Sequence, residues 1–116
     1  MTFRMVVAGV AGLVIGMAAG ASAQDAVAKG KKIYDGATPK CKMCHSIGGE
    51  GNAKGSLDGV GAKVKAEEVK AWLRTPKEMA AKAKAERKPP MPAYTKEKLS
   101  DEDLDALAAY LLSLKK

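Results

Sequence analysis

The chain has 116 residues, a formal net charge of +7 at pH 7, two cysteines and one histidine. This length accommodates one small domain and excludes a multidomain protein. Three Cys and His side chains are too few for a structural zinc site, which usually has four such ligands.

Residues 1–23 have the composition of an export signal. Arg4 is the only charge before Asp25, an apolar run follows it, and Ala-Ser-Ala at 21–23 fits the small-x-small site of signal peptidase. We therefore predict a cleaved secretory signal peptide, residues 1–23, and one mature domain, residues 24–116, in an oxidising compartment such as the bacterial periplasm. The alternative is an uncleaved anchor, because the segment approaches the roughly 20 apolar residues of a spanning helix.

The rest of the chain predicts short helices joined by loops rich in glycine and proline. Apolar residues recur at helical spacing in several segments, whereas no segment alternates as a strand does. The predicted helices cover residues 26–34, 66–74, 76–86 and 99–114, and the six glycines of residues 48–61 predict a long loop. The predicted fold class is therefore all-α.

Two of these helices begin with recognisable capping residues. Thr75, Pro76 and Glu78 predict a capping box at the start of the third helix, and Pro89-Pro90 ends that helix. Ser100 is the predicted N-cap of the last helix.

The chemically distinctive segment is Cys41-Lys42-Met43-Cys44-His45. Its two thiols can each add to one vinyl group of a haem, and the following histidine can bind the iron, so this spacing is typical of c-type haem attachment. A redox-active dithiol would use the same Cys spacing, normally on a β-α-β scaffold. A structural disulfide is also compatible with an exported protein. A haem would complete the core of a small domain with only four aromatic residues after residue 23.

Met91 is the predicted second axial ligand of the iron. With one histidine in the chain, the remaining soft ligand is methionine, and three methionines follow the signal peptide: Met43, Met79 and Met91. Met43 lies inside the attachment motif, on the His45 side, and Met79 fits a core-filling role on a helix. Met91 is surrounded by the prolines of residues 89–92, which fix the backbone and suit a ligand that must hold its place in two oxidation states.

Together these features resemble the class I monohaem cytochromes c of bacteria, over essentially all of residues 24–116. The motifs follow the order of that family: Gly30 with an aromatic residue on the first helix, Cys41-Lys42-Met43-Cys44-His45, Leu57-Asp58-Gly59-Val60-Gly61, the helix from Glu67 to Leu73 with Trp72, Met91-Pro92-Ala93-Tyr94, and a last helix with Tyr110. The resemblance implies a small cytochrome c fold of four to five short helices around one covalently attached haem c. Cys41 and Cys44 would carry this haem.

The resemblance also implies roles for residues around the haem. Gly30 would let the first helix cross closely against Tyr110 of the last helix. Trp72 would border the ring, and its indole N–H would reach a haem propionate. Many relatives have a proline beside the carbonyl that accepts a hydrogen bond from the proximal histidine, whereas this chain has Ser56 there. The bond to His45 can still form, but we expect a more flexible loop.

With His45 and Met91 on the two sides of the iron, the predicted function is one-electron transfer between redox partners, without enzyme activity. The alternative is a haem-based ligand sensor or a peroxidase-like protein with a labile sixth ligand.

The surplus of basic residues predicts partners with acidic docking surfaces. Lys40 and Lys42 flank the first cysteine, and basic residues outnumber acidic ones between residues 77 and 88. Such charges would steer an acidic partner to the haem edge, although lysines also serve simply to solvate helix faces. We expect a monomer without stable membrane insertion after signal cleavage. Nucleic acid is a poor partner for an exported protein with few aromatic residues.

Overall fold

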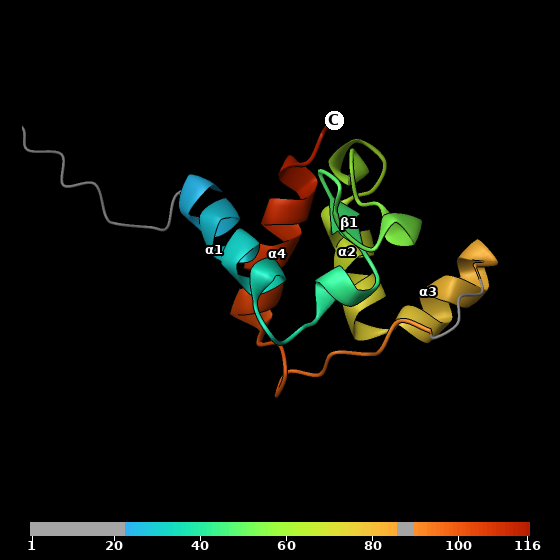
Figure 1. Cartoon of the computed structure of the whole chain (residues 1–116). Helices are drawn as coiled ribbons and strands as arrows, with labels where there is room; N and C mark the ends of the chain where they lie inside the picture. Colours follow the sequence, from blue (N-terminus) through green and yellow to red (C-terminus); the bar gives the residue numbers. More distant parts are fainter. Residues whose placement is uncertain (1–22, 86–89) are drawn as a thin grey trace, which may run out of the picture.

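The computed structural model describes residues 23–85 and 90–116. These residues form four α-helices: α1 (Ala23–Asp35), α2 (Ala66–Arg74), α3 (Pro76–Ala83) and α4 (Asp101–Ser113) (Figure 1). Three short 3₁₀ turns lie between α1 and α2: η1 (Cys41–Met43), η2 (Ala53–Gly55) and η3 (Val60–Ala62). The all-α prediction is confirmed, and all four predicted helices match within three residues at each end. The predicted signal peptide lies outside the described residues except for Ala23.

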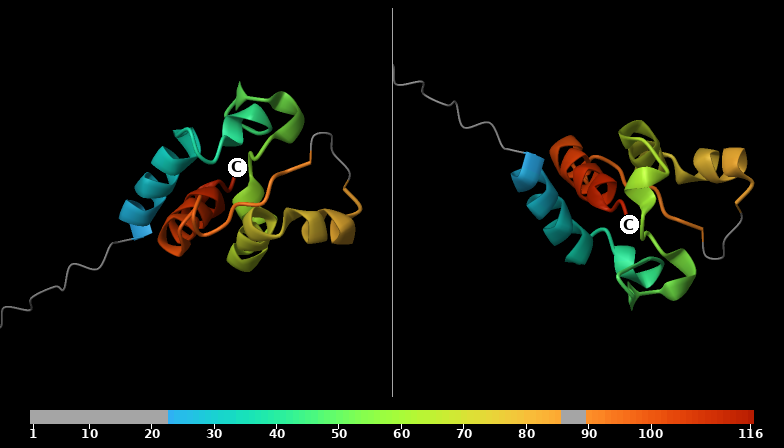
Figure 2. Two further views of the ribbon diagram at one scale, coloured as in Figure 1. Left: turned by 90° about the horizontal axis from the view of Figure 1, so that it is seen from below. Right: turned by 90° about the horizontal axis from the view of Figure 1, so that it is seen from above.

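Helices α1 and α4 lie side by side, as the two views of Figure 2 show. Gly30 lies at their crossing, where a Cβ atom would overlap the carbonyl oxygen of Ala106 and lie 2.6 Å from Cβ of Tyr110. The ring centroids of Tyr34 and Tyr110 are 5.9 Å apart beside this crossing. The predicted close approach of Gly30 to the last helix is therefore confirmed.

The core is centred on the buried face of α4. Ser100 caps this helix as predicted, because its hydroxyl accepts a hydrogen bond of 3.1 Å from the backbone N–H of Asp103. The apolar face of α4 is buried at its centre, where Leu107 is 0% exposed. Tyr34 is also buried, and its hydroxyl has no hydrogen-bond partner among the described residues. Burial raises the pKa of Tyr34 to about 12.

The predicted capping box at the start of α3 is wrong. Pro76 occupies the first turn as expected, but the Thr75 side chain caps nothing in α3. Its hydroxyl instead donates a hydrogen bond of 3.1 Å to the carbonyl of Ala71. Thr75 is also the residue at which α2 ends, and its hydroxyl and its backbone N–H both donate to the carbonyl of Ala71 in the last turn of that helix.

Helix α3 also ends earlier than predicted. Lys84 adopts a left-handed conformation with φ of 51°. The N–H groups of Lys84 and Ala85 then bond to the carbonyls of Ala81 and Ala80, at 3.3 and 2.9 Å, in the pattern of a Schellman motif. The helix therefore stops at Ala83, whereas residue 86 and Pro89 of the prediction lie outside the described residues.

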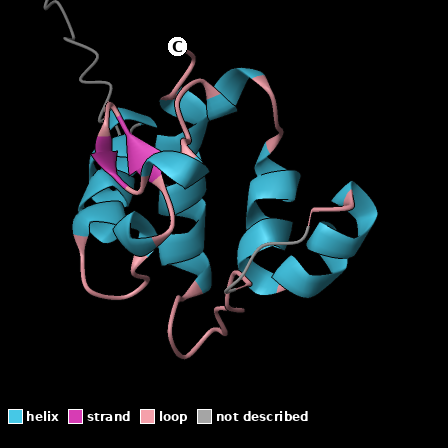
Figure 3. Cartoon of the chain, turned by 45° about the vertical axis from the view of Figure 1, so that its right-hand side comes forward, coloured by secondary structure: helices cyan, strands magenta, loops and turns pink. Residues whose placement is uncertain are grey.

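The loop predicted over residues 48–61 contains one small exception to the all-α architecture. The two-residue strands β1 (Ser46–Ile47) and β2 (Glu50–Gly51) pair antiparallel, as the magenta arrows of Figure 3 show. Gly48 and Gly49 join them with φ of 60° and 86°, which is the geometry of a tight hairpin turn. This hairpin directly follows His45 and so determines where that side chain lies. Across residues 23–85 and 90–116, no helix combines the length and apolar character needed to cross a bilayer.

Candidate haem-binding site

A cavity of about 590 Å³ opens between η1 and the segment that carries Met91. In Figure 1 this segment is the orange loop that runs below η1. Cys41, Cys44 and His45 line the cavity from the η1 side, and Met91 lines it from the other. The four residues predicted as haem attachment points and iron ligands thus all contribute to one cavity.

The orientation of His45 is fixed by a backbone carbonyl. Its Nδ1–H donates a hydrogen bond of 2.9 Å to the carbonyl oxygen of Gly55. A proton on Nδ1 makes Nε2 the basic nitrogen of the ring, which is the form of imidazole that binds a metal. The expected bond to this loop is therefore present although Ser56 replaces the proline of many relatives; the expected flexibility of the loop stays a prediction.

Backbone hydrogen bonds fasten the same loop to His45 from behind. The N–H of Asn52 donates to the carbonyl of His45 at 3.1 Å, and the N–H of Gly55 donates to the carbonyl of Asn52 at 3.1 Å. Together with the bond from the His45 imidazole to Gly55, these two bonds link His45, Asn52 and Gly55 in a closed circuit of three hydrogen bonds. The Asn52 side chain adds a bond of 3.1 Å to the carbonyl of Met43. Sequence reasoning missed Asn52, because an asparagine in a glycine-rich loop has no distinctive spacing.

Gly51 makes this arrangement possible. Its φ of 110° is in the region that side chains disfavour, and a Cβ there would overlap the carbonyl oxygen of His45. Only glycine therefore allows the loop to approach the histidine backbone so closely.

The two cysteines are thiols that face the cavity and do not form a disulfide. Burial raises the pKa of Cys41 to about 11. A redox-active dithiol needs a lowered thiol pKa, so this environment disfavours the thiol–disulfide alternative. Among the described residues, no group of three or more His, Cys, Asp or Glu side chains is arranged to hold a metal ion.

The opposite side of the cavity is formed by residues 90–94, all of which line it. Met91 packs against the hydrophobic core. Tyr94 is the point at which this segment attaches to α2, because its N–H donates a hydrogen bond of 2.8 Å to the carbonyl of Leu73. Burial raises the pKa of Tyr94, while the backbone of Lys40 acts in the opposite direction.

Other predicted residues lie elsewhere. Trp72 is half-buried on α2 and is not among the residues that line the cavity, so its contact with a propionate stays a prediction. Met79, the rejected ligand candidate on α3, does not line it either. Of the basic residues, Lys40 lines the cavity, whereas Lys42 forms an ion pair of 2.9 Å with Asp35.

The donor set fits a covalently attached haem. Two thiols and an imidazole meet a thioether across one open space, whose walls include Pro39, Leu73 and Ala93. The two thiols could therefore carry a haem by thioether bonds from one side, and the imidazole and the thioether could hold its iron between them. The cavity offers this combination.

Comparison with known proteins agrees with this chemistry. Residues 27–115 match the family model of Cytochrome c. No curated protein and no solved structure matched the chain. Since the family match covers most of the chain and includes the whole cavity, the protein belongs to the Cytochrome c family.

Proposed function

We propose that this protein is a periplasmic one-electron carrier of the bacterial class I kind, with one haem c per chain and histidine–methionine axial ligation. Membership of the Cytochrome c family supports haem-based electron transfer. The observation that carries the finer proposal is the single cavity lined by Cys41, Cys44, His45 and Met91.

Each residue has a distinct task in this proposal. Cys41 and Cys44 hold the haem by thioether bonds, and the Gly55 carbonyl holds the His45 imidazole in the tautomer that binds iron. Met91 closes the sixth position against water and small ligands. When bound, a haem with two protein ligands supplies an Fe(III)/Fe(II) couple, and methionine raises its potential relative to a second nitrogen ligand. The chain itself therefore positions and shields the redox centre without bond chemistry.

The proposed partners are redox proteins with acidic docking surfaces. Lys40 and Lys98 line the cavity, and the formal net charge of the chain is +7. Positive charge around the exchange site would steer an acidic partner and weaken its binding as salt rises. The protein would act as an exported monomer after removal of residues 1–23. Association rates that do not fall with ionic strength would contradict the proposed partners.

The decisive experiment compares Met91→Ala with Met79→Ala in holoprotein made with the haem-attachment machinery. We expect the wild type and Met79→Ala to show the sulfur-to-iron charge-transfer band, and Met91→Ala to lose it. The haem spectrum should persist after denaturation in all three, because the thioether bonds remain.

Two results would contradict the proposal. Loss of the band in Met79→Ala but not in Met91→Ala would show that Met79, and not Met91, is the ligand. Ready binding of carbon monoxide by the reduced wild type would instead favour a ligand sensor or a peroxidase-like protein with a labile sixth ligand.

A further inference from the structure

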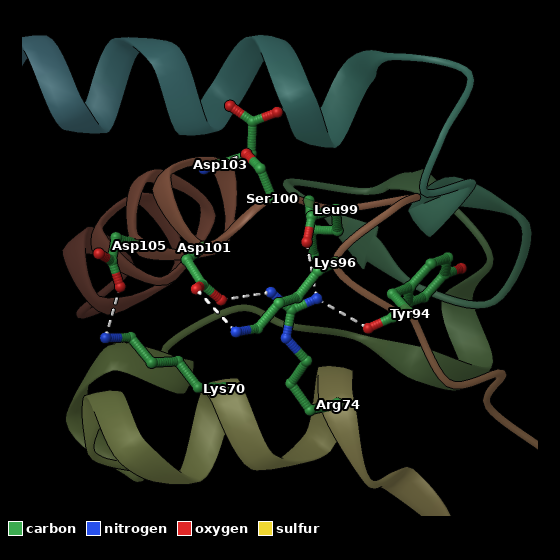
Figure 4. A network of polar contacts seen from close by, with 9 residues as sticks. All are labelled: Lys70, Arg74, Tyr94, Lys96, Leu99, Ser100, Asp101, Asp103 and Asp105. Atoms are coloured by element: carbon green, nitrogen blue, oxygen red, sulfur yellow. Dashed lines mark hydrogen bonds and ion pairs between the residues drawn. The ribbon is translucent and has the colours of Figure 1, made fainter.

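Arg74, the last residue of α2, joins three parts of the chain. Its Nη1 donates hydrogen bonds to the carbonyl oxygens of Tyr94 and Leu99, at 2.8 and 2.6 Å, and its Nη2 lies 2.9 Å from Oδ1 of Asp101 (Figure 4). Only 21% of the side chain is exposed. A guanidinium carries donors on separate nitrogens of one rigid plane, so Nη1 can hold both carbonyls while Nη2 holds the carboxylate, whereas an ammonium has all three donors on one nitrogen.

With the contact from Arg74, both backbone polar groups of Tyr94 are hydrogen-bonded. The N–H of Tyr94 bonds to the carbonyl of Leu73, and its carbonyl accepts from Arg74. Two consecutive residues at the end of α2 therefore hold one residue of the cavity-lining segment. The bonds to Leu99 and Asp101 tie the same side chain to the start of α4.

The anchor at Tyr94 matters because the segment before it makes few bonds of its own. Pro90 and Pro92 have no N–H to donate. Of residues 90–94, Tyr94 is the residue whose backbone bonds to the backbone of another residue, through its N–H to the carbonyl of Leu73. Met91 is thus only three residues from the point at which this stretch is fastened to the helices.

We propose that Arg74 is a positioning residue for Met91: by fixing Tyr94 to α2 and α4, it determines how firmly the methionine holds the sixth position of the iron. This inference rests on the proposed axial ligation by Met91. It assigns to Arg74 a role distinct from helix docking in general, because the side chain bonds directly to the segment that carries the ligand.

The structure provides a matched control on the same two helices. Lys70 of α2 forms an ion pair of 2.6 Å with Asp105 of α4, one turn away from the Arg74 contact (Figure 4). This pair joins the helices without a bond to the segment that carries Met91. Loss of Lys70 should therefore weaken helix docking and leave Met91 in place.

The test is a titration of the ferric holoprotein with imidazole, which competes with the thioether for iron. The apparent affinity for a competitor reports how often the sixth position is open. We expect imidazole to bind Arg74→Leu at least about tenfold more tightly than the wild type, since hydrogen bonds to a charged group are worth this factor. Binding to Lys70→Leu should stay within about twofold of the wild type. The helical signal in circular dichroism checks that the variants are folded.

Arg74→Lys keeps the charge and serves if Arg74→Leu does not fold. An ammonium carries its three donors on one nitrogen, so in the place of Nη1 it could bond to the two carbonyls but not also to Asp101, and the expected increase in imidazole affinity is intermediate, about threefold.

The outcomes separate this inference from the function on which it rests. An unchanged affinity in both Arg74 variants would overturn it, and so would an equal increase in Lys70→Leu, because the effect would then belong to helix docking. If the wild type binds imidazole as tightly as Met91→Ala does and lacks the charge-transfer band, the proposed axial ligation itself fails.

Discussion

The two sides of the cavity are built in different ways. His45 is held by a loop that follows it directly, and the bond from its ring reaches Gly55, 10 residues away. The segment with Met91 is held by Arg74, whose bond to Tyr94 joins residues 20 apart and depends on α2 and α4 being docked. Short loops cost less entropy to close than long ones. We therefore expect the His45 side to be set by local geometry and the Met91 side to yield first when helix docking is disturbed.

The largest predicted effect breaks the His45 side. In Gly51→Ala the new methyl group would overlap the carbonyl oxygen of His45, and φ of 110° is strained for alanine. Since backbone atoms cannot move aside as a flexible side chain can, we expect the free energy of unfolding to fall by about 3 kcal/mol. Denaturant unfolding of the holoprotein measures this change.

Gly49→Ala is the matched control. Gly49 also has a positive φ, 86°, but an added Cβ would meet no atom within 4 Å. Only backbone strain remains there, so the expected loss is about 1 kcal/mol. Equal losses in the two variants would show that contact with His45 contributes nothing.

The sequence predicted the features that depend on neighbouring residues. The spacing of Cys41, Cys44 and His45 indicates haem attachment within five positions. The N-cap of α4 was predicted from Ser100, and the helix itself from apolar residues at helical spacing. Gly30 could be placed at the helix crossing because the resemblance to a known family supplied the partner. Each of these inferences needs only local spacing or a motif.

The missed features depend on contacts that spacing does not reveal. The partners of Arg74 lie 20, 25 and 27 residues further along the chain, so nothing near it in the sequence marks its role. Thr75 and Glu78 have the spacing of a capping box, but the hydroxyl of Thr75 bonds to the end of the preceding helix instead. A local pattern is correct only when no competing acceptor lies nearby in the fold.

A smaller effect on the His45 side is expected from Asn52→Ala. This change removes the bond from Nδ2 to the carbonyl of Met43, 3.1 Å, and the bond from the N–H of Lys54 to Oδ1, 3.0 Å. We expect a loss of about 1 to 2 kcal/mol in the free energy of unfolding, because both bonds lie at the surface. Imidazole binding should not change.

Asn52→Asp sharpens this test, since it keeps the acceptor for Lys54 but replaces the donor to Met43 with a carboxylate oxygen that would face the Met43 carbonyl oxygen. Its loss of stability should therefore be at least as large as that of Asn52→Ala. If either variant binds imidazole as tightly as Arg74→Leu does, the two sides of the cavity are coupled and the comparison above is wrong.

Tyr94→Phe tests a direct link between the two sides. Tyr94 lines the cavity from the Met91 segment, and its hydroxyl interacts with the backbone of Lys40 on the other side. One neutral hydrogen bond at a half-buried site is worth about 1 kcal/mol or less, so we expect a small loss of stability and little change in imidazole affinity. A large increase in that affinity would make Tyr94, rather than Arg74, the residue that holds the segment.

The smallest predicted effect is a dependence on acid pH that belongs to the Met91 side alone. Arg74 and, less strongly, Lys96 hold the pKa of Asp101 below its ordinary value of 3.8. A carboxyl with a lowered pKa in the folded protein stabilises the fold above its ordinary pKa and loses that contribution as pH falls through the lowered value. The stability difference between the wild type and Asp101→Asn should therefore be constant near neutral pH and shrink below about pH 4.

The change should be slight, because Asp101 is exposed and the carbonyls of Tyr94 and Leu99 still hold Arg74. Denaturant unfolding of both proteins across this range measures it: a stability difference that shrinks in acid would attribute the change to this carboxylate, whereas a difference that does not vary with pH would show that Arg74 holds the Met91 segment through the two carbonyls alone.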